Sequence, residues 1–153
     1  MSEKYSRREQ RSSTKILVFD TSAFLAKYHL YVPSHGYTIY TPPTVIEEVR
    51  DMENKEALVL GLELSRITVR SPSQAYRERI MKKAKKKKLS DTDIDVVALA
   101  LELREEGHEV TVLTDDYALQ ELLLENKINV KPLRTRGIKE LSSYDFFSRT
   151  AIK

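Results

Sequence analysis

The chain has 153 residues, of which 41% are apolar, enough to form one domain with a buried core rather than a disordered segment. It contains no cysteine, which excludes disulfide frameworks and cysteine-based zinc sites and predicts a reducing, cytoplasmic location. The formal net charge is +3, and no apolar stretch approaches the roughly 20 residues of a membrane span, so we expect no membrane partner.

Strands and helices are expected to alternate from residue 15 onward. Residues 1–14 have almost no apolar content, so we expect a flexible tail there. The continuous apolar run at 15–19 is typical of a buried parallel strand, and helical spacing follows from 22 to about 30. The next predicted elements are a strand at 37–40, helices from 44 to about 54 and at 55–64, and a strand at 66–70.

The second half of the chain continues the alternation. From residue 74 the pattern is helical into a lysine-rich run, and residues 91–106 are apolar nearly all round, which indicates a central, buried helix. A strand at 110–113, a helix at 117–125 and a strand at 128–130 complete the prediction. This order of elements predicts an α/β fold with a mainly parallel sheet.

The lysine-rich segment concentrates the positive charge of the chain. Residues 77–88 hold eight basic side chains and one acidic side chain, whereas the rest of the chain is net acidic. A basic segment on an acidic protein favours contact with a nucleic-acid backbone, and a solvated surface without a partner is the alternative. The candidate RNA-binding residues are Arg77, Arg79, Lys82, Lys83, Lys85, Lys86, Lys87 and Lys88.

Acidic side chains follow predicted strands or begin predicted helices at four places. Asp20 and the neighbours Asp115 and Asp116 follow strands, while Glu48 and Asp93 are expected in the first turns of helices. Sites in parallel sheets form at the carboxyl ends of strands, so all of these side chains can project toward one edge. Carboxylate oxygens bind Mg²⁺ or Mn²⁺, ions that support phosphodiester hydrolysis. Candidate groups for orienting these carboxylates are the hydroxyls of Thr21, Ser22 and Thr114.

Helix capping is the structural alternative for each acid. Ser90 with Asp93 resembles a capping box, and Thr44 with Glu47 does the same. The aspartates that follow strands can cap the next helix. Glu48 is not explained by a capping box that uses Glu47, so the set as a whole favours a site.

Four segments resemble the ordered acidic motifs of PIN-domain ribonucleases. Within that superfamily the chain most resembles the Nob1 family of endonucleases, which trim the 3′ end of small-subunit ribosomal RNA. The long third motif, the Thr-Asp-Asp-Tyr-Ala-Leu-Gln segment and a later Gly-Ile-Lys-Glu-Leu segment are specific to that likeness. The resemblance covers about residues 15–135, with motifs at 18–24, 45–51, 89–103 and 112–120.

The resemblance implies a three-layer α/β/α domain with parallel strand order 3-2-1-4-5, and cleavage of single-stranded RNA that depends on Mg²⁺ or Mn²⁺. It implies that Asp20, Glu48, Asp93 and Asp116 are the catalytic, metal-binding acids, with Asp115 beside them as a further metal ligand. The implied partners are precursor small-subunit rRNA and, with it, a ribosomal subunit or assembly factors.

The likeness to Nob1 proteins is incomplete at the C-terminal end. Those proteins usually continue into a cysteine-rich zinc ribbon, so for this cysteine-free chain we expect a ribbon that was removed or is naturally absent. We expect the nuclease domain at 15–135 and an extension at 136–153. Two other functions stay open: a toxin ribonuclease, which would bind an antitoxin, and a non-catalytic RNA- or ribosome-binding module.

Overall fold

The structure is a computed structural model that describes residues 15–33, 35–50, 52–64 and 66–133. The predicted tail at 1–14, the extension at 136–153 and the end of the predicted domain at 135 lie outside the described residues. None of the helices in these ranges combines the length and the apolar content needed to span a lipid bilayer.

A five-stranded parallel sheet forms the centre of the fold, with the order β3-β2-β1-β4-β5. All four strand pairings are parallel, which confirms the predicted topology. Strands that alternate with helices form such sheets because a crossover helix returns the chain to the starting edge of the sheet. The strands are β1 (Lys15–Phe19), β2 (Tyr37–Thr41), β3 (Ile67–Val69), β4 (Glu109–Leu113) and β5 (Asn129–Lys131).

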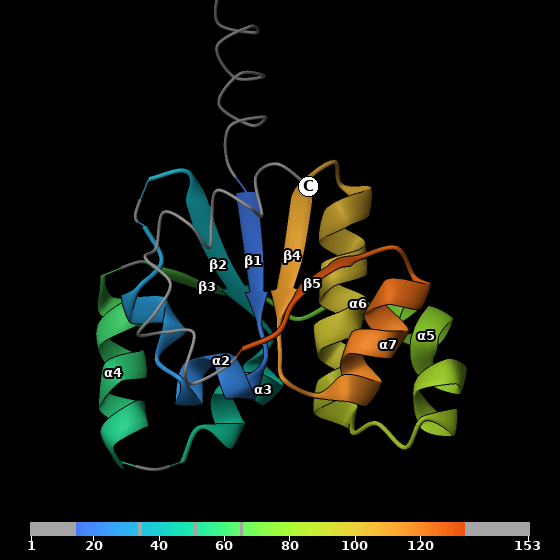
Figure 1. The fold of residues 1–153 in the computed structure, drawn as a ribbon, viewed down its shortest axis with the longest axis horizontal. Helices are drawn as coiled ribbons and strands as arrows, with labels where there is room; N and C mark the ends of the chain where they lie inside the picture. The colour runs from blue at the N-terminus through green and yellow to red at the C-terminus, as the bar shows by residue number, and fades with distance from the viewer. Residues whose placement is uncertain (1–14, 34, 51, 65, 134–153) are drawn as a thin grey trace, which may run out of the picture.

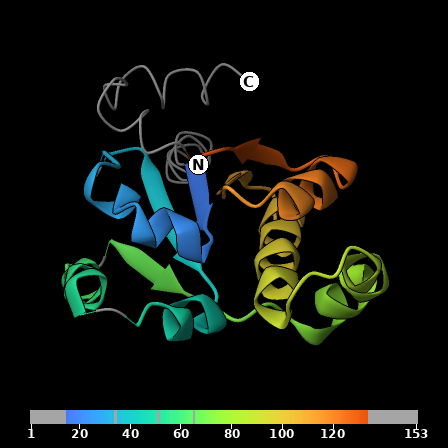
Figure 2. The same ribbon diagram turned by 60° about the horizontal axis from the view of Figure 1, so that its bottom comes forward.

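Helices cover both faces of the sheet and give three layers. Helices α2 and α4 lie on one side, and α6 and α7 lie on the other, with α5 packed on the outer side of α6 (Figures 1 and 2). The helices are α2 (Thr21–Leu25), the 3-10 helix η1 (Tyr28–Leu30), α3 (Pro43–Glu48), α4 (Met52–Glu63), α5 (Gln74–Lys86), α6 (Asp91–Glu105) and α7 (Tyr117–Glu125).

The apolar elements form the core as their sequences predict. Strand β1 is buried from Ile16 to Phe19 because it has neighbours on both edges and helices on both faces. Helix α6 is buried nearly all round because it packs against β1 and β4 on one side and α5 on the other. The predicted helix from 22 to about 30 is wrong in extent: α2 ends early, and Lys27, with φ of 60°, separates it from η1.

The carboxyl ends of the strands define one end of the molecule. In Figure 1 the strands point downward, and α2, α3 and the loop that leads into α6 lie at that lower end. The register places Phe19 beside Leu113, so the residues that follow these two strands are neighbours. Acidic residues that are distant in the sequence therefore lie at the same edge of the sheet.

Candidate active site

Asp20 lies at the end of β1 and is almost fully buried. Its Oδ1 accepts a hydrogen bond of 2.7 Å from the backbone N–H of Thr21, and its Oδ2 accepts one of 2.7 Å from the Thr114 hydroxyl. Thr114 follows β4 directly, so the contact is a consequence of the β1–β4 register. Because each carboxylate oxygen has two lone pairs, each keeps one for a further partner.

Burial is the main reason that the pKa of Asp20 is raised to about 6. Its two hydrogen bonds oppose this shift, whereas the charges of Asp93 and Glu48 add to it. The site therefore holds negative charge that the protein itself does not fully compensate.

Glu48 is the last residue of α3, so the expectation that it lies in the first turn of a helix is wrong. The helix begins at Pro43 and ends where Val49, only 2% exposed, adopts extended backbone with ψ of 95° to reach the core. The predicted capping box of Thr44 and Glu47 does not form. The Glu48 side chain is exposed and accepts a hydrogen bond of 2.5 Å from the Thr21 hydroxyl.

Asp93 lies in the first turn of α6 and closes the predicted capping box. The Asp93 carboxylate accepts from the Ser90 N–H at 3.0 Å, and the Ser90 hydroxyl accepts from the Asp93 N–H at 3.2 Å. The pKa of Asp93 is raised, mainly by burial, and the charges of Asp116 and Glu48 add to the shift. Asp93 is therefore a capping residue and a member of the acid cluster at once.

The two aspartates after β4 have different environments. Asp116 caps α7 by accepting from the Leu119 N–H at 3.1 Å, and its own N–H donates to the Thr114 hydroxyl. Asp115 instead accepts from the Leu133 N–H at 2.5 Å, and its N–H donates to the Ser22 hydroxyl at 3.3 Å. Asp116 contributes to the field at Asp93, whereas Asp115 holds the segment that follows β5.

The structure thus brings four predicted acids into one electrostatic cluster, Asp20, Glu48, Asp93 and Asp116. The charges of Asp93 and Glu48 disfavour ionisation of Asp20, and the charges of Asp116 and Glu48 disfavour ionisation of Asp93. In the part of the chain that the structure describes, no three acidic or histidine side chains already converge as ligands of one ion. The donor set still fits Mg²⁺ or Mn²⁺, because these ions prefer carboxylate oxygens and would offset the repulsion that adds to the effect of burial at Asp20 and Asp93.

The basic segment divides into structural and free side chains. Three of its eight members pair with acids of neighbouring helices, which fixes α5 on α6 and α7. The remaining five, Lys82, Lys83, Lys85, Lys86 and Lys88, are exposed and have no ion-pair partner among the described residues. The pairs are Arg77 with Asp95 (2.8 Å), Arg79 with Glu105 (2.9 Å), and Lys87 with Glu121 (2.6 Å) and Glu125 (3.1 Å).

Asp95 is a buried acid that the sequence analysis did not single out. It is 7% exposed, accepts a hydrogen bond of 2.8 Å from the Thr44 hydroxyl and pairs with Arg77. A signal was present, because a charged residue within a helix that is apolar nearly all round must have a buried partner. The identity of its partners was not predictable from spacing, since Thr44 lies 51 residues away.

A parallel α/β domain with an acid cluster at the carboxyl ends of its central strands is the arrangement expected of a metal-assisted hydrolase. Residues 17–103, more than half of the chain, match the model of the PIN domain of ribonuclease. The chain belongs to the PIN-domain ribonucleases, as its acidic motifs predict.

Its curated relatives carry two kinds of name. Ribonuclease VapC3 of Aeropyrum pernix is 39% identical over 125 residues, which cover 79% of this chain and 88% of the relative. Endoribonuclease Nob1 of Methanothermobacter thermautotrophicus is 34% identical over 131 residues, 83% of this chain and 74% of the relative. Endoribonuclease Nob1 of Archaeoglobus fulgidus is 32% identical over 130 residues, 82% of this chain and 73% of the relative. The predicted resemblance to Nob1 endonucleases is confirmed.

Proposed function

We propose that this PIN-domain ribonuclease is an endonuclease for single-stranded RNA that depends on Mg²⁺ or Mn²⁺ held by Asp20, Glu48, Asp93 and Asp116. The observation that carries the proposal is that the fold gathers these carboxylates at the carboxyl ends of β1 and β4, close enough for Glu48 and Asp93 to act on Asp20 and for Glu48 and Asp116 to act on Asp93. A cluster of this kind gains most from a divalent cation, because a cation offsets the repulsion and favours the ionised form of every member.

The chemistry follows from the groups around the cluster. A bound Mg²⁺ or Mn²⁺ ion would supply an acidified water and neutralise charge developing on the scissile phosphate. Thr114 and Thr21 fix the rotamers of Asp20 and Glu48, so the ligand oxygens are oriented in advance. Ser22 holds the backbone at Asp115 and so supports the turn between β4 and α7. The free lysines at the end of α5 would bind the RNA backbone.

For the substrate we propose precursor small-subunit rRNA, cleaved at its 3′ end, with a ribosomal subunit or assembly factors as partners. Support comes from the several relatives named Endoribonuclease Nob1. A toxin ribonuclease paired with an antitoxin is the second candidate, favoured by the 39% identity to Ribonuclease VapC3. A non-catalytic RNA-binding module is disfavoured, because none of the four acids is missing. A cytoplasmic location stays a prediction.

Cleavage of two RNAs in parallel tests the proposal. One RNA spans the mature 3′ end of small-subunit rRNA, and the other is an unstructured RNA of the same length and composition. We expect one discrete cut at the mature end in Mn²⁺ or Mg²⁺, none in EDTA, and none by the Asp93→Asn variant. Equal cleavage of both RNAs would favour the toxin function, and cleavage that persists in EDTA would contradict the metal site.

A further inference from the structure

Asp95 joins three helices through one buried carboxylate. It lies on α6, its Oδ2 accepts from the Thr44 hydroxyl of α3 at 2.8 Å, and its Oδ1 pairs with the Arg77 Nε of α5 at 2.8 Å. The carboxylate is 7% exposed, and its partners are half-buried. These contacts connect the helix that carries Glu48, the helix that carries Asp93 and the lysine-bearing helix.

Stability alone does not explain a buried ion pair of this kind. Removing two charges from water is unfavourable, and apolar replacements of similar volume are often as stable or more stable. Buried ionic groups are better attested as devices that fix how elements are arranged. We therefore consider first whether Asp95 fixes how the helices that it contacts are arranged.

Asp95 contacts α3, the helix that carries Glu48 of the acid cluster. Thr44 and Glu48 are four residues apart on α3, so they lie on the same face of this short helix. Glu48 on α3 and Asp93 on α6 are carboxylates of like charge, and like charges repel each other. The Thr44–Asp95 hydrogen bond joins the same two helices and opposes their separation.

We propose that Asp95 is a positioning residue that holds α3 against α6 and thereby keeps Glu48 within reach of a cation shared with Asp93. The inference rests on the proposed metal site and deepens it. Arg77 balances the Asp95 charge from the opposite side, so the carboxylate can accept from Thr44 without an uncompensated buried charge.

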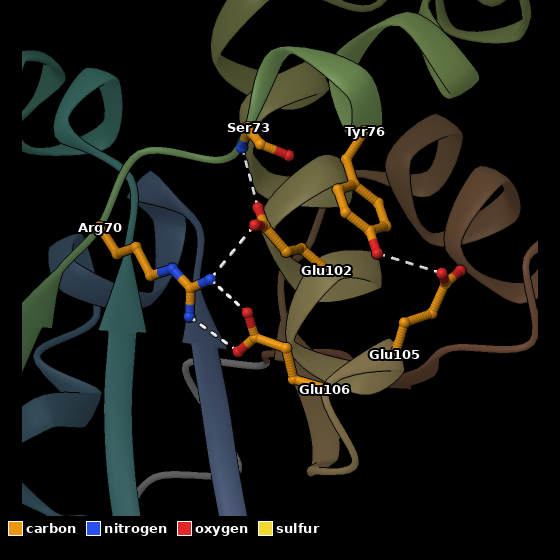
Figure 3. Close-up of polar contacts among 6 residues, drawn as sticks. All are labelled: Arg70, Ser73, Tyr76, Glu102, Glu105 and Glu106. Carbon is orange, nitrogen blue, oxygen red and sulfur yellow. Dashed lines mark hydrogen bonds and ion pairs between the residues drawn. The ribbon is translucent and has the colours of Figure 1, made fainter.

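Helix α6 has other polar contacts that do not involve α3, and they provide a matched control. Figure 3 shows Arg70 paired with Glu102 and Glu106, and Tyr76 of α5 in contact with Glu105. The Tyr76 hydroxyl donates a hydrogen bond of 3.1 Å to Glu105. Thr44→Val and Tyr76→Phe each remove one hydroxyl that donates to a carboxylate of α6, with little change in side-chain volume. Only the first of these hydroxyls connects α6 to the helix of Glu48.

The experiment compares Mn²⁺ affinity, measured by calorimetric titration without RNA, for the wild-type chain and for Thr44→Val, Thr44→Ser and Tyr76→Phe. Loss of a group that hydrogen-bonds a metal ligand typically lowers metal affinity 10- to 100-fold. Thr44 acts on Glu48 only through the position of α3, so we expect an effect at the low end of this range, with Thr44→Val binding Mn²⁺ about tenfold more weakly. Thr44→Ser keeps the hydroxyl and should stay within about twofold of wild type, as should Tyr76→Phe. Thermal melting in EDTA is recorded for each variant to exclude unfolding.

The possible outcomes separate the positioning role of Asp95 from the metal site itself. Wild-type affinity in Thr44→Val would overturn the positioning role while leaving the metal site intact. An equal loss in Thr44→Ser or in Tyr76→Phe would overturn it too, because the effect would then not depend on the hydroxyl that meets Asp95. If the wild-type chain itself binds no Mn²⁺, the proposed metal site fails and the positioning role fails with it.

Discussion

At the scale of single residues, helix capping and metal binding are compatible roles for the same carboxylate. Asp20, Asp93 and Asp116 each accept from a backbone N–H at the start of a helix. Such a hydrogen bond fixes the side-chain rotamer before any cation arrives, so less conformational entropy is lost on binding. The capping roles that compete with a functional interpretation of the sequence therefore support the site in the folded protein.

Asp20 predicts a specific pH dependence of stability without metal. The folded-state pKa of Asp20 is raised from 3.8 to about 6, so the folded protein holds this proton more tightly than the unfolded chain does. The resulting contribution to stability is complete below pH 3.8 and is lost as the pH rises through about 6. In EDTA, Asp20→Asn should become more stable relative to wild type by roughly 2 kcal/mol between about pH 4 and pH 7. Chemical denaturation at both pH values measures this difference. A difference that does not change with pH would show that the pKa is not raised.

Asp93 predicts opposite changes in stability and activity for one substitution. Asn at position 93 still accepts from the Ser90 N–H, and it removes one charge from the cluster. Asp93→Asn should be as stable as wild type or more stable in EDTA, while Mn²⁺ affinity and RNA cleavage fall by at least about tenfold. A role in capping alone predicts the reverse, a stability loss of at most about 1 kcal/mol with normal cleavage. Melting curves and cleavage rates from one preparation distinguish these outcomes.

At the scale of elements, helix α5 carries exposed lysines and is held in place by ion pairs and by packing. Arg77 and Arg79 pair with acids of α6, and Lys87 pairs with acids of α7, while Ile80 and Ala84 are buried beneath the helix. The C-terminal end of α5, the part of the helix that is rich in free lysines, lies at the same end of the molecule as the carboxyl ends of the strands (Figure 1). In the function that we propose, these lysines attract RNA to a site whose own charge repels it.

Removing free lysines of α5 should lower the salt dependence of RNA binding. For single-stranded nucleic acid the slope of log affinity against log salt falls by about 0.7 for each lost phosphate contact. Lys85→Ala with Lys86→Ala should therefore reduce the slope by about 1.4, measured by fluorescence anisotropy of labelled RNA in EDTA. The control, Lys55→Ala with Lys127→Ala, removes the same charge from exposed positions outside α5. If both pairs give the same slope, the α5 lysines only add to net charge.

The sequence predicts most elements but not the break after Glu48. Helix α7 has its predicted bounds, and β1 and α6 match within one residue, because their apolar patterns and caps are local signals. No glycine or proline marks the end of α3 at Val49. The chain leaves the helix there because an extended Val49 reaches the core, a tertiary effect that local pattern does not contain.

At the scale of the whole molecule, the sheet converts four distant segments into one candidate site. Asp20, Asp93 and Asp116 are predicted from strand ends and helix starts, which are local features. The expected position of Glu48 at a helix start is wrong, so its place among the candidates rests on the PIN-domain resemblance. The contacts that refine the site are long-range: Asp20 with Thr114 spans 94 residues, and Thr44 with Asp95 spans 51. Such pairings depend on strand register and helix packing, so they became visible only in the folded chain.

We propose that the carboxylates of Asp20, Glu48, Asp93 and Asp116 together hold one catalytic metal site. Anomalous diffraction from crystals soaked in Mn²⁺ above pH 7, where Asp20 is ionised, tests it most directly. We expect an anomalous peak at the carboxyl ends of β1 and β4, within about 2.0–2.6 Å of oxygens from Asp20 and from at least one of Glu48, Asp93 and Asp116. Ordered crystals with no peak there, or with Mn²⁺ bound only at other acids, would contradict it.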